Sequence, residues 1–204
     1  MRAYIILGNT REKSNTKALA KVFADELTAK GIETTVSSLI GKNINTCVGC
    51  EGCHENIDSF GCVIDDEMQE IAKEILSADL VVFASPIYTW MPTPPLKALM
   101  DRFYAFTKHL SPDLDLGNDQ SFNLLKKQKI AMLATSADKC ETNCDLFDEA
   151  LRRMAAFAKI PYLGYVAACD FDTQNTVTPE ASKNARSFAE KCAAVLEMDG
   201  KDYD

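Results

Sequence analysis

The sequence contains no run of basic residues. Its 22 lysines and arginines are outnumbered by 30 aspartates and glutamates, and the 204 residues carry a formal net charge of −8. Nucleic acids and anionic membranes are bound by clustered lysine and arginine, so neither is expected as a partner. The composition favours small molecules or other proteins as partners.

Long apolar runs are also missing. The apolar stretch at residues 3–7 is too short for the core of a signal peptide. The longest apolar region, Leu80 to Met91, is interrupted by serine, proline and threonine. It is shorter than the roughly 20 residues of a membrane-spanning helix. We therefore expect a soluble, cytoplasmic protein.

Residues for acid–base or nucleophilic catalysis are scarce. The chain has two histidines, His54 and His109, and shows no serine, histidine and aspartate constellation. It has neither a Walker phosphate loop nor the pattern G-x-G-x-x-G, which disfavours nucleoside triphosphates and classical dinucleotide binding. No residue is predicted to be catalytic in the proton-transfer sense.

Cysteine, by contrast, is abundant, with eight residues. In a reducing compartment, clustered cysteines indicate a metal or redox site more often than a disulfide framework. Cys47, Cys50, Cys53 and Cys62 follow the spacing C-x2-C-x2-C-x8-C. Four thiolates at this spacing can converge on one [4Fe–4S] cluster, and three equally spaced cysteines favour iron–sulfur over zinc. The alternatives are a loop of free thiols that holds no cluster and a disulfide formed on handling.

The other four cysteines have separate expectations. Cys140 and Cys144 flank the start of a predicted helix. Cys144 is either redox-active, because a helix N-terminus stabilises a thiolate, or simply a small buried residue. Cys169 and Cys192 lie on a predicted strand and a predicted helix face and are expected in the core.

Short apolar runs alternate with segments of helical period. The expected strands, each followed by a helix, are residues 3–7, 32–39, 80–84, 130–134 and 162–168. This alternation predicts an α/β fold with a doubly wound, five-stranded parallel sheet. Residues 1–204 are expected to form one domain with a cysteine-rich loop insertion at about 41–64.

Three loops are expected to meet at one edge of that sheet. Residues 8–16 are rich in hydroxyl and amide groups and enter a helix N-terminus, which predicts a phosphate site; the simpler alternative is that Ser14 or Asn15 only caps the helix. Residues 84–92 carry Tyr88 and Trp90 and suit a flat aromatic ligand, although each ring could equally be a core or dimer contact. Residues 135–138 form a small polar third loop.

These motifs, in this order, resemble a known family. The first loop resembles the G-S-x-R-x-x-S-x-T phosphate loop of the NADPH-dependent FMN reductases with flavodoxin-like fold. Residues 85–88, with Lys97 and Asp101-Arg102, resemble the S-P-I-Y…K-x-x-x-D-R segment of the same family. The cysteine motif is similar to that of the iron–sulfur flavoprotein branch.

The resemblance implies the strand order 2-1-3-4-5 and FMN as cofactor. It implies phosphate contacts at Asn9, Thr10, Arg11, Ser14, Asn15 and Thr16. It implies isoalloxazine contacts at Pro86, Ile87, Tyr88, Thr89, Trp90, Met91, Thr135, Ser136, Ala137 and Asp138. The metal ligands would be the four cysteines at 47, 50, 53 and 62.

The implied function is that of an FMN-dependent oxidoreductase. It would be an NAD(P)H-dependent reductase of flavins or quinones, or an iron–sulfur flavoprotein that exchanges single electrons with a carrier such as ferredoxin. A homodimer or homotetramer is expected from the resemblance. The alternatives are a flavin-binding redox-sensing module and a zinc-stabilised interaction module, both without turnover.

Overall fold

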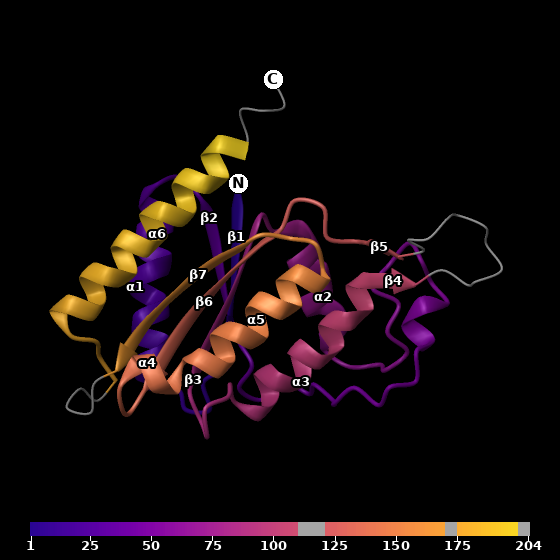
Figure 1. Ribbon diagram of the computed structural model, residues 1–204, viewed down its shortest axis with the longest axis horizontal. Coiled ribbons are helices and arrows are strands. Elements are labelled where there is room, and N and C mark those ends of the chain that lie inside the picture. The colour runs from indigo at the N-terminus through magenta and orange to yellow at the C-terminus, as the bar shows by residue number, and fades with distance from the viewer. Residues whose placement is uncertain (110–120, 170–174, 200–204) are drawn as a thin grey trace.

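The computed structural model describes residues 1–109, 121–169 and 175–199 (Figure 1). A parallel sheet of five strands forms its centre, in the order β2-β1-β3-β6-β7. The strands are β1 (Arg2–Leu7), β2 (Glu33–Ser38), β3 (Leu80–Pro86), β6 (Lys129–Ser136) and β7 (Tyr162–Cys169). Counted within this sheet, the order is 2-1-3-4-5, so the predicted fold class and strand order are confirmed.

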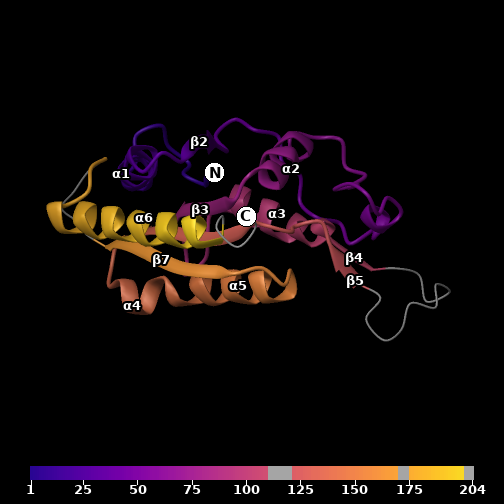
Figure 2. The same cartoon turned by 90° about the horizontal axis from the view of Figure 1, so that it is seen from above.

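Helices cover both faces of the sheet. The helices α1 (Asn15–Ala29) and α6 (Pro179–Asp199) share one apolar cluster with the sheet. On the other face lie α2 (Met68–Ser77), α3 (Pro94–Arg102) and α5 (Asp145–Phe157). Figure 2 shows β7 between α6 and α5. No helix in the described ranges is both long enough and apolar enough to cross a bilayer.

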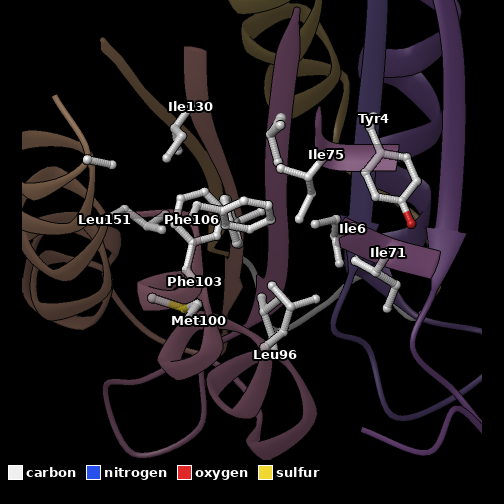
Figure 3. Close-up of a cluster of buried hydrophobic side chains, with 14 of the residues drawn as sticks. Tyr4, Ile6, Ile71, Ile75, Leu96, Met100, Phe103, Phe106, Ile130 and Leu151 are labelled. Atoms are coloured by element: carbon white, nitrogen blue, oxygen red, sulfur yellow. The ribbon is translucent and has the colours of Figure 1, made fainter. Parts of the chain in front are cut away.

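The central strands are apolar because both of their faces are covered. β3 is buried from Leu80 through Ser85, and β6 from Lys129 through Thr135. Strands buried on both faces have continuous apolar runs in place of alternation, which is why these segments were recognisable. Figure 3 shows buried apolar side chains on the face of the sheet covered by α2, α3 and α5, among them Ile6, Phe103 and Phe106.

Two predicted features differ from the structure. The apolar residues Pro94, Leu96, Leu99, Met100, Phe103 and Phe106 predict a single helix. In the structure α3 ends at Arg102, and the 3-10 helix η2 (Phe103–Phe106) follows it. A small antiparallel pair, β4 (Thr107–His109) and β5 (Ser121–Asn123), was not predicted: His109 was expected to end the preceding helix, and residues 111–128 were expected to be loop. Strands of three residues show too little periodicity to be detected. Residues 110–120, between these two strands in the sequence, lie outside the described residues.

The cysteine-rich segment at 41–64 connects β2 to α2 and packs on the α3 side of the sheet. It contains the short helix η1 (Gly52–His54). Its Phe60 is buried, and the Phe60 ring centroid lies 4.9 Å from that of Phe106. One aromatic side chain therefore anchors the segment to the core.

Candidate functional site

Three loops at the carboxyl edge of the sheet enclose a pocket of about 350 Å³. Strand order reverses at β1 and β3, the place where doubly wound sheets bind ligands. The pocket is lined by Asn9, Thr10, Arg11, Ser14, Asn15, Thr16, Pro86, Ile87, Tyr88, Thr135, Ser136, Ala137 and Asn175. All residues predicted for the phosphate line this pocket, together with most of those predicted for the ring.

Gly8 sets the start of the first loop. Its N–H donates to the Ala84 carbonyl at 2.7 Å, and its carbonyl accepts from the Thr93 hydroxyl at 2.5 Å. A Cβ at this position would lie 2.8 Å from Leu96 Cβ and 2.9 Å from Thr93 Oγ1. Only glycine lets α3 approach the first loop this closely.

The first loop provides a positive helix end. The Ser14 hydroxyl caps α1 by accepting from the Lys17 N–H at 3.2 Å, as the simpler alternative held. The first turn of α1 contains no acidic residue to offset the positive end of the helix dipole. Arg11 adds a full positive charge at the rim. The loop can therefore bind an anion as well as cap the helix.

Asn9 contributes a buried acceptor to the pocket. Asn9 is 3% exposed, and its Nδ2 donates to the Arg11 carbonyl at 2.6 Å. Its Oδ1 has no hydrogen-bond partner among the described residues. A buried acceptor without a donor costs free energy, so this atom favours a ligand that brings a hydroxyl or N–H group.

Side chains tie the three loops together. The Thr10 and Tyr88 hydroxyls lie 3.0 Å apart, and the buried Thr16 and Thr135 hydroxyls 2.6 Å apart. The Ile87 N–H also donates to the Thr135 carbonyl at 2.8 Å. The pocket is thus preorganised by contacts between loops far apart in sequence.

Some predicted ring contacts lie outside the lining, namely Thr89, Trp90, Met91 and Asp138. A tight turn joins Tyr88 and Met91 through reciprocal backbone bonds of 2.9 and 3.2 Å. Thr89 and Trp90, the two central residues of this turn, adopt left-handed φ values of 50° and 63°. Trp90 is 50% exposed.

Asn175 lines the pocket although nothing in its sequence neighbourhood indicated it. Its backbone N–H donates to Asn15 Oδ1 at 2.6 Å. The two residues are 160 positions apart. Only the packing of α6 beside α1 brings them together.

The cysteine segment has four free thiols. Cys47 and Cys50 are exposed, and Cys53 and Cys62 are partly buried. Burial raises the pKa of Cys53, and the nearby Lys108 charge opposes this shift without reversing it. The charges of Cys62 and Cys50 also raise the pKa of Cys53, so these three cysteines lie near one another.

Two buried cations lie beneath these thiols. Arg102 is 1% exposed; its Nη1 contacts the Asp66 carboxylate oxygens at 2.6 and 2.8 Å, and its Nη2 lies 3.3 Å from Cys62 Sγ. Lys108 is fully buried, and its ammonium donates to the carbonyls of Cys53 at 2.7 Å and Phe60 at 3.1 Å. The sequence did not indicate that Lys108 is buried, because lysine side chains are usually exposed.

The remaining cysteines partly correct the sequence interpretation. Cys140 and Cys169 form a disulfide, although neither was expected to be paired. Cys169 is the register partner of Ser136, the last residue of β6, and α4 (Cys140–Asn143) begins four residues after Ser136. Burial, with the charges of nearby acidic residues, raises the pKa of Cys144 to about 11, the opposite of the stabilised thiolate considered from the sequence. Cys192 is buried in the core, as predicted.

Curated relatives are iron–sulfur flavoproteins. One from Methanocaldococcus jannaschii is 36% identical over 102 residues, which cover 50% of this chain and 51% of that protein. One from Methanosarcina thermophila is 31% identical over 97 residues, covering 48% and 49%. The chain spans about half the length of the curated relatives it matches.

Solved structures show the same fold at low identity. RosB with a bound riboflavin-5'-phosphate intermediate has a TM-score of 0.73 at 15% identity, covering 97% of this chain and 79% of that one. The NAD(P)H:quinone oxidoreductase from Methanothermobacter marburgensis has a TM-score of 0.67 at 16% identity, with 97% and 96% covered. The model of the NADPH-dependent FMN reductase family matches residues 1–174. The chain therefore belongs to the NADPH-dependent FMN reductase family and has a flavodoxin-like fold.

Proposed function

We propose that this protein is an FMN-dependent oxidoreductase that takes electrons from NAD(P)H and passes them to a small acceptor such as a quinone or free flavin. The observation that carries the proposal is the pocket in which the positive N-terminus of α1, the Arg11 charge and the unpartnered Asn9 Oδ1 converge. A phosphorylated ligand with hydroxyl groups satisfies all three. Bound FMN would supply the hydride and electron chemistry.

The residues around the pocket have distinct proposed tasks. Arg11, Ser14 and the first N–H groups of α1 bind the phosphate. Asn9 accepts from a hydroxyl of the ribityl chain. Residues 86–88 and 135–137 offer backbone groups and a half-exposed Tyr88 ring beside the isoalloxazine. No side chain is assigned as a proton donor or acceptor for the reaction.

We further propose that Cys47, Cys50, Cys53 and Cys62 hold a [4Fe–4S] cluster, which would make the protein an electron-transfer flavoprotein with a carrier such as ferredoxin as partner. The supporting observation is the pair of buried cations: Arg102 lies against Cys62, and Lys108 against the Cys53 backbone. A cluster with four thiolate ligands is anionic, so both charges stabilise it. Arg102 also orients Cys62.

The smallest proposed assembly is a homodimer. Tyr88 and Trp90 are 46% and 50% exposed beside the pocket, and a second copy could cover both rings. A solution mass of one chain at micromolar concentration, measured by light scattering, would contradict this proposal.

The experiment that tests the function starts from protein purified without oxygen and loaded with FMN. We expect one FMN per chain and NADPH-dependent reduction of a quinone. Colourless protein that does not take up FMN would support the zinc-stabilised interaction module. Bound FMN without turnover would support the redox-sensing module. Either result would overturn the proposed reaction.

The cluster has its own test. Replacing Cys53 with serine is expected to lower the iron content from about four per chain to nearly none, since one ligand of the cluster is lost. Iron and sulfide are measured in anaerobic protein. The control is Cys192→Ser, because Cys192 is a buried free thiol on α6 remote from the segment. Equal iron in the two variants would assign the metal elsewhere.

A further inference from the structure

A second group of sulfur atoms lies beside the flavin pocket. The sulfurs of Cys140, Cys144 and Cys169 all lie within 4.8 Å of one another. Cys140 and Cys169 are joined as a disulfide with a Cα separation of 5.6 Å, and Cys144 is a free thiol. Three sulfurs at this separation allow more than one disulfide pairing.

The disulfide is accessible from outside. Cys140 and Cys169 line an open hollow of about 700 Å³, whose wall also includes Asn15, Lys139 and Glu141. The two bonded cysteines are partly buried, whereas Cys144 behind them is fully buried. A small molecule in the hollow can therefore reach the disulfide without reaching the third sulfur first.

The hollow and the flavin pocket share a wall. Asn15 lines both. Cys169 is the register partner of Ser136, which lines the flavin pocket. The disulfide thus lies at the sheet edge that carries the proposed cofactor site.

Cys144 is the free thiol among the three cysteines. Burial is the main cause that raises its pKa to about 11, and the charges of Asp145, Asp148 and Glu141 add to it. At neutral pH Cys144 is a protonated thiol and a weak nucleophile, which leaves the Cys140–Cys169 pairing in place. When Cys140 is bound in a mixed disulfide or has been replaced, Cys144 is the remaining thiol within 4.8 Å of Cys169.

We propose that Cys140, Cys144 and Cys169 form a redox-active thiol–disulfide site whose substrates are low-molecular-weight thiols and disulfides that enter the 700 Å³ hollow. In the reductive direction, a thiolate of a small dithiol attacks one sulfur of the disulfide, forming a mixed disulfide and releasing the other cysteine as a thiolate, which takes up a proton. The second thiol of the reagent then displaces the protein sulfur. The dithiol leaves as a cyclic disulfide, and the protein gains two electrons and two protons.

In the oxidative direction, a small disulfide such as oxidised glutathione receives the same two electrons. Two protein thiols lose their protons, one S–S bond forms in the protein, and two small thiols leave. With three cysteines in reach, the bond can form as Cys140–Cys169 or as Cys144–Cys169. A disulfide with a purely structural role does not require a third sulfur at this distance.

The decisive experiment maps disulfides in the Cys140→Ser variant. The folded protein is incubated with oxidised glutathione and a chelator, alkylated, digested and analysed by mass spectrometry. We expect a Cys144–Cys169 disulfide in most chains. The matched control, Cys192→Ser, is expected to keep Cys140–Cys169. Cys144 and Cys169 found unpaired in folded Cys140→Ser would overturn the proposal.

A measurement on the unmodified protein guards against misfolding of the variant. Native protein is treated with millimolar dithiothreitol, and differential alkylation then labels the thiols at 140 and 169. We expect both to become labelled while the circular dichroism spectrum is unchanged, and the bond to return on addition of oxidised glutathione. A bond that opens only after the chain is unfolded would contradict the inference. Neither readout requires bound flavin or iron, so their outcome is separate from that of the proposed function.

Discussion

Replacing Arg102 with methionine is expected to lower the free energy of unfolding by about 3–5 kcal/mol. The Arg102 and Asp66 side chains are 1% and 0% exposed, and they form an ion pair at 2.6 Å. The variant leaves the Asp66 carboxylate buried without its cation, and it releases Cys62 and the Ile64 carbonyl from the guanidinium. Urea unfolding followed by circular dichroism measures the loss.

Two controls separate the buried pair from general effects. Lys97→Met removes one partner of an exposed pair with Asp101 and is expected to cost less than about 1 kcal/mol. Asp66→Asn combined with Arg102→Met removes both buried charges and should recover part of the loss. An Arg102→Met protein no less stable than Lys97→Met would mean that the pair is not buried in solution.

The penalty should also depend on pH. Burial raises the pKa of Asp66, but hydrogen bonds from Arg102 and from the Asn45 and Met68 N–H groups outweigh it, and the pKa lies below its ordinary value. The stability that this carboxylate contributes is present above the unfolded pKa of about 4 and is lost as pH falls through the lower folded pKa. The difference between wild type and Arg102→Met is therefore expected to shrink in acid. A difference independent of pH would contradict this assignment.

The double variant Arg11→Ala, Ser14→Ala is expected to raise the Kd for FMN by about 100-fold. It removes one charge and one hydroxyl from the proposed phosphate site at the start of α1. Riboflavin has the same ring and ribityl chain without the phosphate, so its Kd should change by less than about threefold. Flavin fluorescence quenching measures both constants.

The same loop contains a matched control. Lys13 is a neighbouring basic residue that faces a different hollow, and Lys13→Ala should leave FMN binding nearly unchanged. The Ser14 change also removes the cap of α1, which costs about 1 kcal/mol of stability, so binding is measured well below the melting temperature. Equal weakening of FMN and riboflavin would show that the phosphate does not bind at this loop.

Local patterns were enough for the sheet and for most of the pocket. Continuous apolar runs such as Leu80 to Ala84 mark strands that are covered on both faces, and the loops after those strands must meet at one edge. The residues that line the pocket in the first loop could therefore be predicted from their place between a strand and a helix. Trp90 was predicted as a ring contact because an aromatic side chain in this loop suits a flat ligand, but in the structure Trp90 lies in the tight turn between Tyr88 and Met91 and does not line the pocket.

Groups that meet only through packing had no local signal. Asn175 reaches the pocket through a bond to Asn15, Lys108 is buried under Cys53, and Cys169 pairs with Cys140. In each case the partners lie 29 or more residues apart in the sequence. The residue type alone suggests a loop amide for Asn175, a surface lysine for Lys108 and a core cysteine for Cys169.

The sequence by itself determined the parallel α/β sheet, its edge of ligand-binding loops and the spacing of Cys47, Cys50, Cys53 and Cys62, because each depends on periodicity or on short motifs. Only the tertiary structure decided which charges lie under those cysteines and which thiols lie within reach of one another. Burial and pairing are properties of segments brought together from distant parts of the chain, and they set both the cost of a buried charge and the partner of a thiol.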